Sequence, residues 1–446
     1  MRIFITMFFI LPLTPLLTMG SAVAVAQSLP EVLTLEQAVT LATHADPWLS
    51  GSQYTQQALT DEASAAATLP DPRISLMAGN FPVDTFDINQ EAMTQLSVGI
   101  SQMFPRGDSL SLTQQQKRQL AEQHPLLRMN RRARVTATVT QLWLEAYKAQ
   151  ETIRLIEQDR VLFEQLVDVT EASYSSALGR VRQHDVIRAQ LELTRLSDRL
   201  TVLRQKQQSA QQRLSEWIGA PATTTIAPVL PTISPVRSLT SPSTETASTQ
   251  NLYESIRHHP ALRALDQRID ATETGVDLAK QKYKPEWGLT AQYGYRDSDP
   301  LGRDRADLFS IGVTFDLPVF TANRQDREVS AAVNRSEVIK TEKQLLARQL
   351  MAELETARVQ LERLDERQIL YTEQLLPQMV EQASASLTAY NNDDGDFAEA
   401  VRARIAELNA KIDALDIAVE RQKIISQINY LLAQVSPDDA QSVETF

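Results

Sequence analysis

The sequence lacks several features on which common protein classes depend. It has no cysteine, which excludes a disulfide framework, a thiolate metal site and a thiol nucleophile. Only 13 of 446 residues are glycine, too few for a typical catalytic α/β domain with its phosphate-binding loops. Lysine and arginine number 44 against 56 acidic residues, which argues against nucleic acid as a partner because phosphate neutralisation needs clustered basic residues.

Long hydrophobic runs are absent as well. After residue 26, no segment approaches 18 consecutive apolar residues, so no transmembrane helix is expected. Residues 1–26 have the pattern of a secretory signal peptide, with Arg2, a short apolar block and the small residues Ala24-Val25-Ala26 before Gln27. A membrane anchor is the alternative, but the block contains two prolines and is shorter than the roughly 20 residues that span a bilayer. The sequence therefore predicts an exported protein.

What the sequence does contain is an internal repeat. SVGISQMFP at 97–105 returns as SIGVTFDLP at 310–318, and Asp46-Pro47 returns as His259-Pro260, both 213 positions later. A segment at 220–250, rich in proline, serine and threonine, separates the halves and has no helix or strand pattern of its own. We therefore expect two repeats, at 27–219 and 251–436, joined by this linker and followed by a tail at 437–446.

Each repeat contains two stretches in which apolar and polar residues alternate. They lie at about 73–80 and 94–105 in the first repeat, and at about 286–296 and 307–318 in the second. Strict alternation predicts strands with one apolar and one polar face. Their length suits transmembrane β-strands, although two amphipathic hairpins of a soluble domain are an alternative.

The rest of each repeat is predicted to be one long helical hairpin, at about 109–218 and about 319–436. Long stretches without glycine carry apolar residues at heptad spacing, which is typical of coiled coils. In the first hairpin the predicted seam is Val135, Val139, Leu142, Ala146, Ala149, Ile153 and Ile156. Each rod is expected to turn back near Gly179 or Gly395.

Four strands cannot close a barrel, and an open sheet edge in lipid leaves backbone groups unpaired at a cost of several kcal/mol each. Closure must therefore come from further copies of the chain. Two copies would supply eight strands and three would supply twelve, and the pattern by itself leaves the number open.

In this combination of features the sequence resembles the TolC-like outer-membrane efflux factors. The matching segments are the Asp46-Pro47 and His259-Pro260 pairs, the strand ends Gly99–Pro105 and Gly312–Pro318, and the tips at 174–193 and 390–408. The resemblance implies a mixed α/β membrane protein, a homotrimer whose twelve strands, four per chain, form one barrel in the outer membrane. A coiled-coil helical tunnel would continue into the periplasm.

The resemblance also implies partners and a role. The partners would be outer-membrane lipid, a periplasmic adaptor (membrane fusion protein) and an inner-membrane efflux transporter, and the role would be a duct opened by iris-like movement of the tips. The stretch LPDPRISLMAGNFPV at 69–83 looks most like members that are paired with heavy-metal pumps. Methionines 77, 93 and 103 lie in or beside this hairpin and suggest soft-metal contacts, with flexible apolar packing as the alternative.

Carried over to this sequence, the resemblance places a pore constriction at the second tip. Glu399 and Arg402 take positions usually held by a pair of aspartates, so a purely anionic ring is in doubt and a self-paired ring is expected instead. Asp185 matches an acid of the first tip that holds the closed state, while Tyr390 and Asp396 stand where a rewired latch is expected. A solvated acidic turn is the alternative for this segment. Gly179 and Gly395 would form the helix-tip turns around which the adaptor docks.

No catalytic, cofactor or metal-binding motif accompanies this pattern. The five histidines occur in no HExxH arrangement, and there is neither a P-loop nor GxSxG. An enzyme is therefore not expected. The stronger alternative is an envelope-spanning coiled-coil adaptor or scaffold without a channel, but such a protein would lack the duplicated pair of lipid-suited strands.

Overall fold

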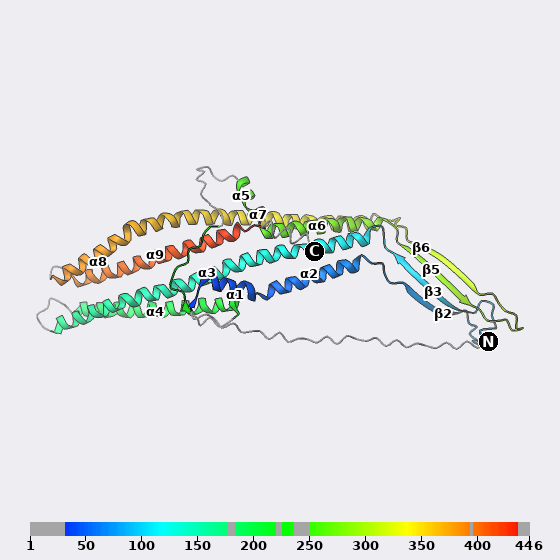
Figure 1. Cartoon of the computed structure of the whole chain (residues 1–446), viewed down its shortest axis with the longest axis horizontal. Helices are drawn as coiled ribbons and strands as arrows, with labels where there is room; N and C mark the ends of the chain where they lie inside the picture. The colour runs from blue at the N-terminus through cyan, green and yellow to red at the C-terminus, as the bar shows by residue number, and fades with distance from the viewer. Residues whose placement is uncertain (1–31, 176–182, 220–224, 236–248, 393–395, 436–446) are drawn as a thin grey trace.

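The computed structural model describes residues 32–175, 183–219, 225–235, 249–392 and 396–435. Figure 1 shows helices along one long axis, with a sheet at one end and two helical tips at the other. The first half contains, in order, β1 (Val32–Leu33), α1 (Leu35–Ala45), α2 (Pro47–Ala66), β2 (Arg73–Gly79), β3 (Gln95–Phe104), α3 (Ser109–Ser175), α4 (Gln183–Ile218) and β4 (Thr225–Ile226).

The second half repeats this order. It contains α5 (Thr249–Ile256), α6 (Pro260–Lys280), the short 3₁₀ turn η1 (Gln281–Tyr283), β5 (Trp287–Tyr295), β6 (Leu308–Phe315), α7 (Gln325–Leu370), the π-helical segment η2 (Tyr371–Leu375), α8 (Leu376–Asn391) and α9 (Phe397–Leu431). All four predicted strands are present, close to their expected positions.

The two repeated dipeptides begin corresponding helices. The Asp46 carboxylate accepts a hydrogen bond from the Trp48 backbone N–H at 3.0 Å and so caps α2. His259 caps α6, because its Nδ1 accepts from the backbone N–H of Ala261 at 3.3 Å. Proline suits the next position in both repeats, since the first N–H of a helix has no intrahelical partner.

The first rod is one continuous helix. α3 has 67 residues, which corresponds to a length of about 100 Å. The predicted heptad seam is confirmed, since all of its residues from Val135 to Ile156 are buried. The second rod is also helical without a break, from Gln325 to Asn391, but η2 replaces the regular α-helix with a π-helical turn shortly before Pro377. Proline cannot donate the backbone hydrogen bond that a regular helix needs there.

The long strands form one antiparallel sheet in the order β2-β3-β5-β6. β3 and β5 join the two repeats at its centre, with Val98 opposite Tyr293. β2 and β6 are the outer strands, and within the described residues each has a single neighbour in this sheet. Two ladder edges are therefore open in the single chain.

Three clusters of buried apolar side chains lie along the axis. One surrounds Trp143 of α3, whose Nε1 donates to the Leu33 carbonyl at 3.0 Å. Its counterpart in the second repeat surrounds Leu354 of α7. The third lies toward the tips, where Phe397 and Val401 of α9 pack with residues of α3 and α4. This third cluster joins the hairpins of the two repeats.

The predicted linker is not free of strand structure. β4 lies within it and pairs in parallel with β1, with Val32 opposite Thr225. Two residues are too few to show a periodic pattern, so this pairing could not be predicted from the sequence. The predicted signal peptide at 1–26, Gly179, Gly395 and the tail at 437–446 lie outside the described residues. Among the helices that the structure describes, none is both long and apolar enough to span a membrane.

Candidate transport pathway

The two faces of the four-stranded sheet differ in chemistry. Leu76, Val98, Tyr293 and Phe309 stand in one row across the strands, on the apolar face. All four are exposed in the single chain, Leu76 by 79% and Phe309 by 71%. Exposed apolar surface costs roughly 25 cal/mol per Å² in water, and an apolar face of this extent indicates contact with lipid or protein.

The opposite face is built of small and polar residues. Ser75, Gly99, Gln292 and Ser310 form the neighbouring row. A Cβ atom on Gly99 would lie 2.7 Å from the Ser75 Oγ, so a larger residue there would require the Ser75 side chain to move. Arg73, opposite Ser101, is the one charged residue in the four strands. This face can border water.

Ion pairs connect the sheet to the helices at the end where the strands meet them. Arg106, which follows β3, donates to the Lys284 carbonyl at 3.0 Å and pairs with Asp316, which follows β6. Lys284 in turn pairs with Asp108 at 2.9 Å. These contacts connect the two repeats at the point where the strands end, so the sheet and the rods are held in a fixed relation.

The predicted residues of the second tip flank the start of α9. The Asp396 carboxylate accepts from the Ala398 backbone N–H at 3.4 Å and caps the helix. The Tyr390 ring packs edge-on against Phe397, with 5.5 Å between the ring centres. Asp396 and Tyr390 thus have structural contacts that the sequence did not indicate.

Glu399 and Arg402 are both exposed, one turn apart on α9. The Arg402 guanidinium donates to the Ala398 carbonyl at 3.1 Å. Among the described residues of a single copy, Arg402 makes this backbone contact and no ion pair with Glu399, and the pairing of rings from different copies stays a prediction. Asp185, from the other hairpin, is 94% buried in the first turn of α4, with the His184 Nε2 at 3.3 Å.

A group of charged residues on α9, about two turns from the second tip, was not predicted from the sequence. Glu407 of α9 is buried and binds both Arg404 at 2.7 Å and Lys411 at 2.8 Å. Asp159 of α3 faces this group, and burial raises the pKa of its carboxyl, against the lowering effect of Lys411. The i, i+3 and i, i+4 spacing of 404, 407 and 411 was the available signal. No group of three or more His, Asp or Glu that could hold a metal ion occurs among the described residues.

The comparisons with known proteins agree with this architecture. Residues 251–434, which make up the second repeat, match the family model of the outer membrane efflux protein. The second repeat is therefore similar to this family in sequence. No curated protein matches it by sequence.

Solved structures show the same fold over 90% of the chain, so the similarity extends beyond the second repeat that the family model covers. The outer-membrane channel OprN is 17% identical, with a TM-score of 0.73 and 90% of each chain covered. VceC of Vibrio cholerae is 14% identical, with a TM-score of 0.73 and coverage of 90% of this chain and 96% of VceC. CusC, described as forming a transmembrane channel, is 13% identical with a TM-score of 0.70 and covers 90% and 92%.

The match of the second repeat to the outer membrane efflux protein model, together with the fold shared with outer-membrane channels, confirms the predicted location at the outer membrane and reaching into the periplasm. The family is one of channels and not of enzymes. The exposed apolar face of the sheet and the long rods are the parts of this chain that suit those two surroundings.

Proposed function

We propose that this protein is the outer-membrane duct of a tripartite efflux pump. One observation carries the proposal: a sheet with one apolar face, one small polar face and two open edges continues into rods about 100 Å long. Three copies would supply twelve strands and pair each β2 with a β6 of the next copy. The apolar face then contacts outer-membrane lipid, and the face with Gly99 and Ser310 surrounds the lumen.

In the periplasm, the rods of three copies form the tunnel. The partners are a periplasmic adaptor, which docks around the hairpin tips, and an inner-membrane transporter, which loads the duct. The docking turns at Gly179 and Gly395 remain predictions. Support for the tunnel comes from the third apolar cluster, which holds the two hairpins of one copy side by side.

The gate is proposed to lie at the tips and to open by an iris-like movement of the helices. Glu399 and Arg402 form the constriction, a role that their exposure on one side of α9 supports. Asp185, Tyr390 and Asp396 hold the closed arrangement. The burial of Asp185 and the ring contact of Tyr390 are consistent with holding contacts rather than with contact to passing ions.

Heavy-metal cations are the proposed substrate class. The proposal depends on the sequence at 69–83 and on the methionines of the first hairpin. Met77 and Met103 occupy the small-residue face of the sheet, which borders the proposed lumen. Thioether sulfur suits soft cations, and weak, open contacts suit a conduit that must release its cargo. The test uses cells that lack their own duct and express this protein. Their resistance to silver and copper salts is compared with their resistance to organic dyes.

Single-channel conductance of the purified mature protein in a planar bilayer tests the proposed function. We expect a small, cation-selective conductance that rises when Asp185 is replaced by Asn and the closed tip is weakened. Asp198→Asn, an exposed acid on the same helix, is the matched control and should leave conductance unchanged. No channel activity from folded protein would instead favour the adaptor or scaffold, an alternative that the fold does not favour.

A further inference from the structure

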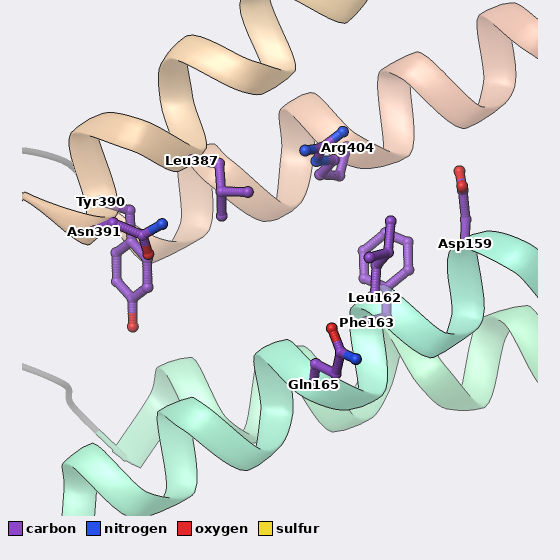
Figure 2. Close-up of a pocket in the computed structure, with 8 residues that line it drawn as sticks. All are labelled: Asp159, Leu162, Phe163, Gln165, Leu387, Tyr390, Asn391 and Arg404. Atoms are coloured by element: carbon purple, nitrogen blue, oxygen red, sulfur yellow. The ribbon is translucent and has the colours of Figure 1, made fainter.

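A cavity of about 160 Å³ lies between the two hairpins near their tips. Figure 2 shows Leu387 and Tyr390 of α8 on one side of it and Leu162 and Phe163 of α3 on the other. At one end stand Asp159 of α3 and Arg404 of α9, and the amides of Gln165 and Asn391 complete the lining. A largely apolar cavity of this volume accommodates roughly one benzene-sized ring.

Of the two carboxylates near this end of the cavity, Glu407 is paired with cations and Asp159, in the described part of the chain, is not. Glu407 engages both nearby cations, Arg404 at 2.7 Å and Lys411 at 2.8 Å. Asp159 is half-buried, and within the described residues its carboxylate takes part in no hydrogen bond or ion pair. A carboxylate with free acceptor sites beside an apolar cavity favours a ligand that brings its own charged N–H donors.

We propose that this cavity binds a small arylalkyl amine, whose ring packs against Phe163, Leu387 and Tyr390 and whose ammonium group pairs with Asp159. Size and charge both point to this class, since the cavity takes one ring and the carboxylate complements one cation. Tyr390 also presents an aromatic surface to the ring, and aromatic pairs are more stable than burial of their area alone would make them.

The site bridges elements from both repeats. A ligand in it contacts α3 and α8 at once, so its binding free energy favours the arrangement in which these helices have their present separation. An amine bound here would therefore hold the two hairpins of one copy together. This role is separate from passage through the lumen, because the cavity lies between hairpins of a single chain.

Binding should weaken in acid. The groups that face Asp159 are Arg404, Glu407 and Lys411 of α9. Burial, aided by the negative charge of Glu407, raises the pKa of Asp159 and outweighs the lowering effect of Lys411 and Arg404. As the pH falls through that raised value, the carboxyl becomes neutral and the ammonium group loses its partner. The amine itself stays charged throughout, so the change reports on the protein.

Calorimetric titration of the purified protein with 2-phenylethylamine and 2-phenylethanol at pH 7.5 tests the site. The two probes share their shape, and only the first is charged. We expect the amine to bind about tenfold more tightly than the alcohol, as for one charge-assisted hydrogen bond. Asp159→Asn should reduce that ratio to about one while retaining the shape of the side chain. Glu164→Gln, which changes an acid of α3 outside the cavity, should leave it unchanged.

Filling the cavity provides an independent variant. Leu387→Trp leaves Asp159 in place but occupies the ring position, so both probes should lose affinity together. Failure of wild-type protein to bind the amine, or equal binding by the Asp159→Asn variant, would overturn the proposal. Because binding is measured without a membrane, these results are distinct from the bilayer conductance that tests the duct.

Discussion

The two repeats reach the same architecture with different chemistry at corresponding positions. In the first, Asp46 caps α2 and its buried carboxylate pairs with Arg131 at 2.7 Å. That guanidinium lies over the rings of both Trp48 and Trp217. In the second repeat the capping residue is His259, whose Nε2 donates to the Tyr430 carbonyl at 3.2 Å and whose ring meets the Tyr430 ring edge-on.

The comparison teaches that the repeat requires a capping acceptor before proline but not a particular charge. In the first repeat the capping Asp46 lies in an ion pair next to two indole rings. In the second repeat the capping His259 contacts the uncharged carbonyl and ring of Tyr430. The rods differ as well: α3 continues through residues 158–162, whereas η2 replaces regular α-helix in the second rod 213 positions later. Isolated π-helical turns often occur at functional sites, and we expect the turn at η2 to make the second rod the more deformable of the two.

The largest expected effect comes from removing the ion pair of the first repeat. Arg131→Met leaves the Asp46 carboxylate buried without a cation, and the free energy of unfolding should fall by about 3 kcal/mol. Denaturation of the purified protein measures this. Arg263→Met is the control, because Arg263 is exposed and its partner Asp266 lies at 3.7 Å, so its loss should cost less than about 1 kcal/mol. Equal effects would mean that the Asp46 pair is unimportant.

A second prediction concerns the rods. Amide hydrogens of residues 371–375 should exchange at least about tenfold faster than those of residues 158–162, because a π-helical turn has weaker hydrogen bonds and opens at lower cost. Hydrogen exchange with mass spectrometry measures both segments at once. Pro377→Ala restores a backbone donor and should slow exchange in the second rod only. Pro125→Ala, in α3, is the control and should leave residues 371–375 unchanged.

The two caps should also differ in their response to pH. Burial lowers the pKa of His259, so between that value and the ordinary value of about 6.5 the unfolded state binds more protons than the folded state. Stability from this group is complete above about pH 6.5 and is lost as the pH falls, by at most about 1.4 kcal/mol per pH unit. His259→Asn keeps a capping acceptor and should reduce the loss of stability between pH 7.5 and 5.5.

His258→Asn is the matched control, since this neighbouring side chain is exposed. Unfolding curves at the two pH values should be displaced equally for this variant and for the wild type. A loss of stability in acid that persists in His259→Asn would assign it to other groups, such as His124, whose pKa is also lowered by burial.

The smallest effect is expected at the tips, where the acid of the first repeat is buried and that of the second is exposed. Glu399→Gln should weaken block by trivalent cations from the periplasmic side by about threefold, since it removes an exposed charge from the proposed constriction. Channel recordings with graded blocker measure this. Glu381→Gln, an exposed acid of α8, should leave block unchanged. Unaltered block in Glu399→Gln would remove Glu399 from the constriction.

Much of the fold could be predicted because it depends on periodic patterns. Period two indicated the four strands, and the heptad indicated the buried seam from Val135 to Ile156. Features that depend on contacts between distant segments could not be predicted. The pairing of β1 with β4 and the burial of Asp185 belong to this class. Pro377 was visible in the sequence, but proline alone does not distinguish a π-helical turn from a simple kink.

The cavity beside Asp159 shows the same limit. Its lining comes from α3 and, more than 200 positions later in the chain, from α8 and α9. No single stretch of sequence predicts the cavity or shows that Glu407 forms ion pairs with Arg404 and Lys411. For the predicted constriction residues Glu399 and Arg402, the sequence indicated only that they lie on a helix. The structure adds that both are exposed and that Arg402 binds the Ala398 carbonyl.

The open edges of β2 and β6 have a consequence for inheritance. If each copy completes its neighbours' ladders, a copy with one defective edge disables every assembly it enters. A strand variant such as Ile311→Pro, which removes a backbone donor from β6, should therefore be dominant over the wild-type gene when both are expressed. Deleting the gene outright should be recessive, because the remaining copies still assemble with one another.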